Sequence, residues 1–372
     1  MIPVFRPFLL SLFAAAAWAQ EPIKVGEYAS LTGKESSLGT SSHQGTVLAV
    51  EQINAAGGVL GRPIELIAED TSSKPGESGT SVRKLIFRDK VIAVLGEVAS
   101  SRSLEAAPVC QNARIPMITP ASTNPQVTQV GNYIFRTCFI DPFQGATLAR
   151  FALGTLHARR IAILSSVSSA YSVGLAKFFR ATFVAGGGEV AAEPKYSEGD
   201  KDFYAQLTAI KAAGVDAIFN PGYYNEGALI VKQARGLGIT APIFGGDSWE
   251  AQELIDLGGP ATEGAYLSSH YSPDNPAPRV QAFIAAYRQR FGGKTPDSNA
   301  SLGYDSVLVL ADALKRAGST DHVLLRDAIA ATKDFDAVTG RITIDAQRNA
   351  SKNLVIQQVH DGHFRFVESI AP

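Results

Sequence analysis

The sequence has 372 residues, of which 45% are hydrophobic and 19% charged, and 34 basic residues nearly balance 35 acidic ones. A formal net charge of −1 gives no excess of positive charge, so nucleic acid and anionic lipid are excluded as expected partners. The length exceeds one ordinary hydrophobic core and therefore predicts two domains or lobes.

Residues 1–19 are predicted to be a secretory signal peptide. Arg6 precedes an apolar stretch from Phe8 to Trp18, and Ala17 and Ala19 form a small-x-small cleavage site. The apolar stretch is too short to span a membrane as a mature helix. Cleavage after Ala19 would place the protein in the periplasm. The alternative is an uncleaved anchor, because the basic region before the apolar stretch is thin.

Strand-like and helix-like segments alternate through the first part of the remaining chain. We expect strands at residues 23–30, 63–70, 91–100 and 115–122, with helices at 42–58, 77–89 and 103–114 between them. The same alternation of strands and helices occurs again further along the chain. The second set of strands is expected at 159–166, 188–197, 215–222 and 242–248, with helices at 173–186, 203–213 and 225–237.

The last part of the chain adds two amphipathic helices and a hairpin. The helices are expected at residues 275–292 and 301–318, and the hairpin at 353–369 with Asp361-Gly362 as its two-residue turn. Strands joined by helices run parallel through right-handed crossovers, which gives sheets covered on both faces. Because the pattern occurs twice, the fold class is predicted to be α/β with two doubly wound lobes.

Several predicted strands end in polar residues. The strand ends read "AVLGEVASSRS", "MITPASTNP", "AILSSVSSAYS", "AIFNPGYYNE" and "FGGDSWE". Ligands of open parallel sheets bind outside the carboxyl ends of the strands, and the helix that follows each strand offers free amides to an anion. Ser100, Ser101, Ser122 and Thr123 could instead be simple helix N-caps. The recurrence of polar strand ends at five places across both halves of the chain favours a ligand cleft that takes a carboxylate.

Catalytic, metal and cofactor sites are not expected. A nucleophilic serine needs a histidine base, and the sequence has no G-x-S-x-G elbow. His360 and His363 lie across the hairpin turn, which is weak support for zinc. Gly186–Gly188 separates a helix from a strand and lacks the placement of a dinucleotide-binding loop. Cys110 and Cys138 could pair in an oxidising compartment, and the sequence leaves that pairing open.

The motifs taken together resemble a known family. "INAAGG", "ITPASTNP", "RTCFIDPFQG", "GYYNEGALIVKQARGLG" and "FGGDSW" occur in the order and spacing typical of branched-chain amino-acid substrate-binding proteins of ABC importers. The resemblance covers the whole mature chain. It implies a type I periplasmic-binding-protein fold, in which three crossing strands join the two lobes. By this resemblance, lobe 1 is 20–140 plus 271–345, and lobe 2 is 141–270 plus 346–372.

The resemblance also implies a site in the cleft between the lobes. Ser100 matches the serine whose hydroxyl holds a ligand α-carboxylate, and Ala121 and Thr123, with Ser122 between them, match the strand end that completes the carboxylate site. The lobe 2 residues of the implied site are Tyr171, Tyr223 and Asp247, with Asp247 at the position of the acid that pairs with the α-ammonium.

The side-chain pocket departs from the family pattern. Leu38 stands where the best-known amino-acid binders have an aromatic residue, and residues 299–301 lack a large aromatic side chain. An aliphatic amino acid is the first expectation for the ligand, and an aromatic amino acid or another small carboxylate or amide remains open. The implied partner is an inner-membrane ABC permease, with a periplasmic sensor as the alternative role, and the protein is expected to be a monomer.

Overall fold

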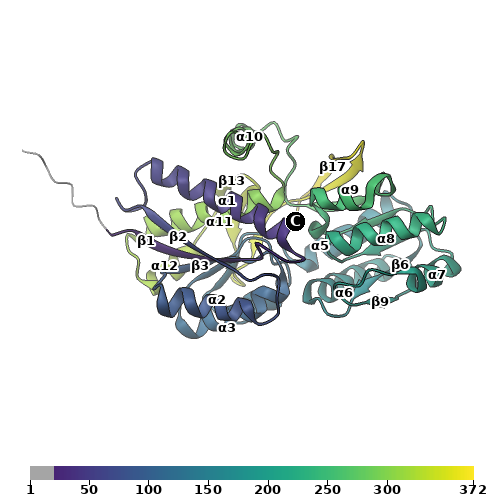
Figure 1. Cartoon of the computed structure of the whole chain (residues 1–372), viewed down its shortest axis with the longest axis horizontal. Coiled ribbons are helices and arrows are strands. Elements are labelled where there is room, and N and C mark those ends of the chain that lie inside the picture. The colour runs from purple at the N-terminus through teal and green to yellow at the C-terminus, as the bar shows by residue number, and fades with distance from the viewer. Residues whose placement is uncertain (1–20) are drawn as a thin grey trace, which may run out of the picture.

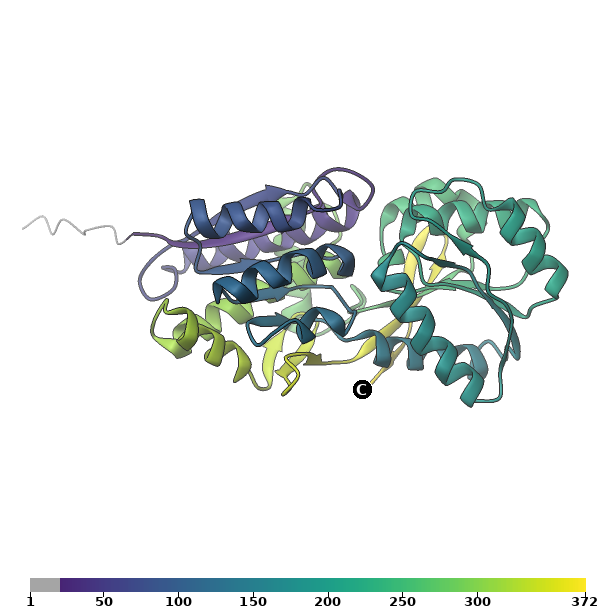
Figure 2. The same cartoon turned by 90° about the horizontal axis from the view of Figure 1, so that it is seen from below.

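The computed structural model describes residues 21–372, so the predicted signal peptide lies outside the described residues. Two α/β lobes lie side by side along the long axis of the molecule (Figure 1). Each lobe is built around its own sheet. Figure 2 shows the same two lobes from below, with the C-terminal strands running from the junction into the right-hand lobe.

Lobe 1 contains a five-stranded sheet with the order β2-β1-β3-β4-β5, in which all neighbours are parallel. The strands are β1 (Ile23–Ala29), β2 (Ile64–Asp70), β3 (Ala93–Leu95), β4 (Met117–Thr119) and β5 (Ile134–Arg136). The helices are α1 (Ser36–Ala55), α2 (Glu77–Arg83) with its π-helical continuation η1 (Lys84–Arg88), α3 (Ser100–Ala113), α4 (Gln126–Gln129), α10 (Pro278–Arg290), α11 (Ser298–Ala317) and α12 (His322–Ala330).

Lobe 2 contains a seven-stranded sheet with the order β17-β16-β12-β11-β10-β6-β8. The strands are β6 (Arg160–Ile163), β8 (Glu189–Ala192), β10 (Ala217–Asn220), β11 (Ile243–Gly245), β12 (Tyr266–Ser269), β16 (Leu354–His360) and β17 (His363–Ile370). The neighbouring strands β8, β6, β10, β11 and β12 are parallel to one another. Strand β16 is antiparallel to both of its neighbours, β12 and β17. The helical segments are α5 (Asp141–Gly154), α6 (Ala170–Ala185), α7 (Tyr204–Ala213), α8 (Tyr224–Gly236), η2 (Asp247–Trp249), α9 (Gln252–Gly258) and η3 (Gly259–Thr262).

Two smaller sheets complete the fold. The strands β7 (Ser165–Ser166) and β9 (Lys195–Tyr196) pair in lobe 2, and β13 (Phe335–Ala337), β14 (Gly340–Ile344) and β15 (Ala350–Ser351) form a sheet beside lobe 1. The predicted hairpin is confirmed, since β16 and β17 pair from His360 opposite His363 outward.

Several observed elements begin or end a few residues from the predicted positions. The strand predicted at 91–100 is only three residues long, because the chain leaves the sheet and starts α3 at Ser100. The helix predicted at 173–186 begins at Ala170, where the Ser169 hydroxyl accepts a hydrogen bond of 3.3 Å from the Ser172 amide. This contact is an N-cap, which fixes the start of a helix more firmly than hydrophobic spacing does.

The hydrophobic interior is divided between the lobes. One large cluster combines residues from 139–267 with Leu354, Ile356 and Val359 and takes in Leu38 and Ala99 from lobe 1. Another combines residues from 23–135 with residues from 307–350. We therefore propose the division of the chain into 20–140 plus 271–345 and 141–270 plus 346–372. In this division the first crossing segment lies near residue 140, the second near residue 270 and the third near residue 345. The pairing of β15 with β14 places the third crossing a few residues later, after Ser351.

The structure also decides the state of the two cysteines. Cys110 lies on α3 and Cys138 on the first crossing segment, and both are buried free thiols. The disulfide that the sequence left open is therefore not formed. Burial raises the pKa of both thiols, which keeps them protonated and unreactive.

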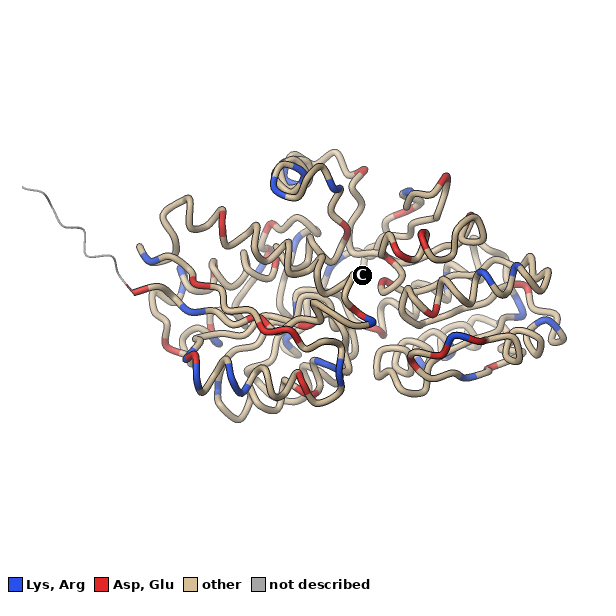
Figure 3. Tube along the Cα trace, in the orientation of Figure 1, with Lys and Arg blue, Asp and Glu red and all other residues tan. Residues whose placement is uncertain are grey.

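Acidic and basic residues are interspersed along the chain in both lobes (Figure 3), in keeping with the small net charge. Among residues 21–372, no helix combines the length and the apolar character needed to cross a membrane.

Candidate functional site

The residues predicted for the ligand site all follow strands of the two large sheets or begin a helix beside them. Ser100 is the first residue of α3, which follows β3, and 121–123 follow β4. In lobe 2, Tyr171 lies in the first turn of α6, Tyr223 precedes α8, and Asp247 begins η2 directly after β11. These positions lie at the carboxyl ends of parallel strands, where open sheets bind ligands.

The hydroxyl groups of lobe 1 differ in how they are used. The Ser100 Oγ accepts a hydrogen bond of 3.2 Å from the Asn124 amide, so its own hydrogen is free to donate. The Thr123 Oγ1 is buried and makes no hydrogen bond of ordinary geometry in the described part of the chain, and it lies beside the Asp141 carboxyl, whose pKa burial raises to about 8. By contrast, the Ser122 Oγ donates to the Glu97 carbonyl at 2.8 Å and lies 2.7 Å from the Ser103 Oγ. Ser100 and Thr123 can therefore bind an anion, whereas the Ser122 hydroxyl is used within the protein.

The first turn of α3 adds a favourable electrostatic environment to these hydroxyls. Helix α3 is 14 residues long and begins at Ser100. The first amides of a helix carry partial positive charge and lack intrahelical acceptors. A carboxylate placed between Ser100 and Thr123 would meet hydroxyl and amide donors, and the buried Arg136 guanidinium lies nearby, where it donates to the carbonyls of Ser122 and Asn124.

Asp247 of lobe 2 receives hydrogen bonds from three side chains. Its Oδ1 accepts from the Gln144 Nε2 at 2.7 Å and from the Tyr171 hydroxyl at 2.8 Å, and its Oδ2 lies 2.9 Å from the His270 Nε2. Burial raises the pKa of this carboxyl, but the hydrogen bond from His270 and the electrostatic effect of that ring, followed by the hydrogen bonds from Gln144 and Tyr171, outweigh burial and hold the pKa below its ordinary value. Asp247 is therefore a charged carboxylate at neutral pH.

His270 connects Asp247 to the junction between the lobes. Its ring stacks on Phe139 with centroids 3.7 Å apart and planes at 19°, and these two residues belong to two different crossing segments. Burial lowers the pKa of His270, and the neighbouring Asp247 opposes that effect without cancelling it. The imidazole is therefore neutral, with its Nε2 hydrogen donated to Asp247.

The wall between the two polar ends is apolar and aromatic. The rings of Tyr171 and Tyr223 lie 5.6 Å apart. Leu38 comes from lobe 1, but it is buried in the hydrophobic cluster that includes both tyrosines and otherwise belongs mainly to lobe 2. Ala121 is buried beside Cys138 and Leu302 in a smaller cluster. These contacts provide an apolar surface for a ligand side chain.

A second carboxyl group lies near the lobe 1 side of the site. The Glu97 Oε1 accepts a hydrogen bond of 3.0 Å from the Ser30 amide, and its Oε2 is buried without a partner among residues 21–372. Burial, together with the charge of Glu35, raises the pKa of Glu97 to about 8. Of Glu97 and Asp247, only Asp247 therefore carries a full charge at neutral pH.

The lobes touch directly across the cleft, so the structure is a closed form. The Lys34 ammonium lies 2.6 Å from the Glu198 carboxylate, and the Tyr224 hydroxyl donates to the Lys34 carbonyl at 3.0 Å. The Asn124 side-chain amide donates to the Ala170 carbonyl at 2.7 Å. Closure explains why every predicted site residue is buried.

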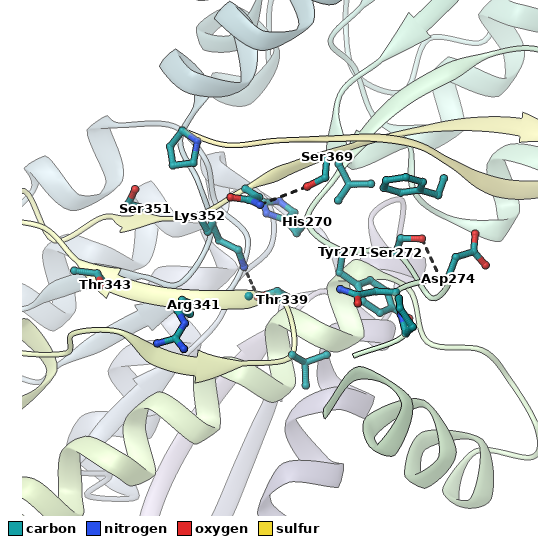
Figure 4. A pocket seen from close by; sticks show the side chains of 18 of the residues that line it. His270, Tyr271, Ser272, Asp274, Thr339, Arg341, Thr343, Ser351, Lys352 and Ser369 are labelled. Atoms are coloured by element: carbon teal, nitrogen blue, oxygen red, sulfur yellow. Dashed lines mark hydrogen bonds between the residues drawn. The ribbon is translucent and has the colours of Figure 1, made fainter. Parts of the chain in front are cut away.

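A cavity of about 830 Å³ lies elsewhere, between the second and third crossing segments (Figure 4). His270 lines it, but none of the eight residues predicted for the ligand site does. The size of this cavity therefore does not identify the amino-acid site. The residues predicted for the amino-acid site lie elsewhere, and Thr123 and Tyr171 flank the contact between Asn124 and Ala170 that joins the two lobes.

Gln144 and His270 were not identified from the sequence. Gln144 is part of "RTCFIDPFQG", one of the segments that carried the resemblance, so a signal for it existed. His270 is an isolated histidine at a strand end, and neither its spacing nor its neighbours in the sequence indicated a contact with Asp247. Its role depends on the packing of two crossing segments that are distant in sequence.

Two α/β lobes that close over a cleft with hydroxyl donors on one side and a carboxylate on the other define a solute-binding protein. The family model described as "Periplasmic binding protein" matches residues 22–363. The chain belongs to this family, which confirms the resemblance and the type I periplasmic-binding-protein fold. The members are binding proteins, so the chain is not an enzyme.

Similar proteins show which ligands this architecture takes. A leucine-, isoleucine-, valine-, threonine- and alanine-binding protein of Pseudomonas aeruginosa is 30% identical over 346 residues, covering 92% of this chain and 91% of that protein. The crystal structure of the leucine-binding protein LivK of Thermotoga maritima is 40% identical, with a TM-score of 0.90 over 94% of this chain and 99% of that one. A solute-binding protein of an ABC transporter from Rhodopseudomonas palustris, in complex with 3,4-dihydroxybenzoic acid, is 28% identical, with a TM-score of 0.84 over 94% of this chain and 96% of that one.

Proposed function

We propose that this protein binds an amino acid in the cleft between its lobes and delivers it to an ABC permease of the inner membrane. The observation that supports this proposal most directly is the burial of a charged Asp247 in lobe 2 and of the Ser100 and Thr123 hydroxyls in lobe 1, with Asn124 beside Thr123 contacting lobe 2 at Ala170. This arrangement suits an α-ammonium at one end and an α-carboxylate at the other. Family membership agrees with a periplasmic location, and cleavage after Ala19 stays a prediction.

The apolar wall of Leu38, Tyr171 and Tyr223 favours an aliphatic side chain. The amino acids bound by the Pseudomonas and Thermotoga relatives agree with that preference. Each lobe supplies only one end of the binding site, so a ligand that contacts both ends stabilises the closed form over the open one. The permease would then recognise closure.

A small aromatic carboxylate is the second candidate ligand. Leu38 leaves more room than an aromatic residue would, and the Rhodopseudomonas relative holds a dihydroxybenzoic acid. Such a ligand would use Ser100 and Thr123 but would offer no ammonium to Asp247.

A thermal-shift panel on ligand-stripped mature protein tests the proposal. It would contain the twenty L-amino acids, isocaproate as leucine without its amino group, and isoamylamine as leucine without its carboxylate. A ligand at 100 times its Kd adds about 2.7 kcal/mol to the free energy of unfolding, which raises Tm by several degrees at most. We expect leucine, isoleucine or valine to raise Tm and both truncated analogues to fail. If no amino acid raises Tm and an aromatic acid does, the second candidate replaces the first.

A further inference from the structure

The cavity between the crossing segments has the features of a second ligand site. Its volume is about 830 Å³, within the range of small-molecule sites in proteins. Residues 270–276 form one side, and residues 334–343 and 351–355 form the other. Phe366 and Ser369 of β17 close the third side. Figure 4 shows the side chains of these segments converging on the same space.

Lys352 provides a buried ammonium at this cavity. Its residue is 3% exposed, and Figure 4 shows the side chain reaching toward Thr339. Thr339 Oγ1 is the one hydrogen-bond partner of the Lys352 Nζ among residues 21–372. An ammonium carries three N–H donors, so two remain for another acceptor in the cavity.

Thr339 and Asp305 stabilise the positive charge of Lys352. Thr339 donates its hydroxyl to Asp305 at 2.6 Å, and Asp305 also accepts from the amides of Val338 and Thr339 at 2.8 and 2.9 Å. Burial lowers the pKa of Lys352 to about 8, although Asp305 opposes the decrease. The amine is therefore protonated at neutral pH, while Asp305 already has three donors of its own.

The remaining lining is apolar on the inside and charged at the rim. Val338, Val355 and Tyr271 are buried beside the cavity, and Phe366 at the rim is 47% exposed. Asp274, Asp334 and Arg341 are exposed lining residues, so the rim carries charges of both signs. The apolar walls favour a hydrocarbon body, and Lys352 is the buried charged group among the lining residues.

We propose that this cavity binds a small monocarboxylate with an apolar body, with the carboxylate on the Lys352 ammonium and the body against Val338, Val355 and Phe366. The site is separate from the cleft, and the proposal does not depend on the amino-acid function. The carboxylate supplies the acceptor that Lys352 lacks, and the hydrocarbon chain covers the exposed ring of Phe366.

Calorimetric titration of octanoate into the mature protein tests this proposal, with two variants of the cavity. Lys352→Met removes the charge, and Ser369→Trp fills the cavity from an exposed position on β17. We expect saturable binding of octanoate to the natural protein, and a loss of affinity of about tenfold to a hundredfold in each variant. Because Ser369 is exposed, its variant keeps the test valid if Lys352→Met fails to fold.

Two controls separate the cavity from the cleft. The double variant Ser100→Ala/Asp247→Asn disables the cleft and should bind octanoate with unchanged affinity. Octanamide, which lacks the charge, should bind at least about tenfold more weakly than octanoate. The proposal is overturned if octanoate shows no saturable binding up to about 10 mM, or if the cleft variant abolishes binding while Ser369→Trp retains it.

Discussion

Asp247 is held by donors from three different parts of the chain: Gln144 on α5, Tyr171 on α6 and His270 after β12. Each donor stabilises the charged form of a carboxyl group that burial alone would protonate. A carboxylate has about four acceptor sites, so the three contacts leave room for one further donor. This arrangement suits a ligand ammonium and explains why Asp247 can remain charged inside a closed cleft.

Replacing Asp247 by alanine tests its proposed role. Loss of the partner of a buried ammonium costs roughly 3–5 kcal/mol, so the affinity for the amino acid identified in the thermal-shift panel should fall by about two to four decades. Calorimetric titration measures this change. Asp256→Ala on α9 is the matched control, because Asp256 is exposed and in the same lobe. Unchanged affinity of Asp247→Ala would refute the assignment.

Glu250 predicts a pH dependence of stability at the residue scale. Burial, followed by the charge of Asp297, raises its pKa to about 8 in the folded protein, whereas an unfolded glutamate titrates near pH 4.3. A raised pKa means that the folded state holds the proton more tightly. The contribution of Glu250 to the free energy of unfolding is therefore complete below about pH 4. It is lost as the pH rises toward 8, at about 1.4 kcal/mol per pH unit.

The variant Glu250→Gln removes this titration. From pH 5 to pH 7.5 the natural protein should lose about 3 kcal/mol of unfolding free energy through Glu250, and the variant should not show this loss. Urea unfolding at the two pH values measures the difference. Glu253→Gln, three residues further along the chain and partly exposed, is the control and should behave like the natural protein. Equal pH slopes for Glu250→Gln and the natural protein would contradict the prediction.

At the scale of elements, the contact between α1 and α11 requires glycine at two positions. A Cβ on Gly45 would lie 1.8 Å from the Ala300 carbonyl oxygen, and a Cβ on Gly303 would lie 2.1 Å from the Ser42 carbonyl oxygen. Both contacts involve backbone atoms, which cannot move aside as a flexible side chain can. The two helices therefore pack backbone against backbone, and this contact positions the start of α11 near the cleft.

Alanine at Gly45 should force α1 and α11 apart. Overpacking of this kind costs about 1–3 kcal/mol or more, and the free energy of unfolding in urea should decrease accordingly. Gly154→Ala is the matched control, since a Cβ there has no neighbour within 4 Å among the described residues. The control should be neutral or stabilise by up to about 1 kcal/mol. If both variants are equally stable, the helices have an alternative way to pack.

At the scale of the whole molecule, direct contacts between the lobes stabilise the closed form and so reduce the binding free energy that a ligand must supply to close it. The pair Lys34–Glu198 joins the loop before α1 to the loop before α7, and the Lys34 side chain is 31% exposed. Pairs at such positions contribute about 0.2–1 kcal/mol. The contact therefore assists closure without being strong enough to hold the lobes shut by itself.

Small-angle scattering of the mature protein should show this balance. We expect a smaller radius of gyration at saturating ligand than in the ligand-stripped protein, because the ligand selects the closed form. Lys34→Met should weaken ligand binding by up to about fivefold and leave the radius at saturation unchanged. Lys74→Met, at an exposed lysine of lobe 1, is the control. An identical radius with and without ligand would contradict ligand-driven closure.

Local patterns in the sequence predicted most of the elements and the edge of each sheet where the polar residues gather. The observed boundaries differ from the predicted ones where an N-cap sets the start of a helix, as at Ser169, or where a strand pairs over only three residues, as in β3. Ser100, Thr123 and Asp247 could be proposed because they match the ligand-binding positions of the family that the sequence resembles, and because each lies shortly after a strand. The use of the Ser122 hydroxyl within the protein could not be predicted, because it depends on Glu97 and Ser103.

The sequence by itself determined the alternation of strands and helices, the balance of charge and the family, since these are properties of neighbouring residues and their spacing. The tertiary structure decided that both cysteines are free, that His270 fixes Asp247, and that Lys352 lies in a cavity between the crossing segments. The physical reason is the same in each case. Each result depends on how segments distant along the chain pack against one another, and the spacing of neighbouring residues in the sequence does not specify that packing.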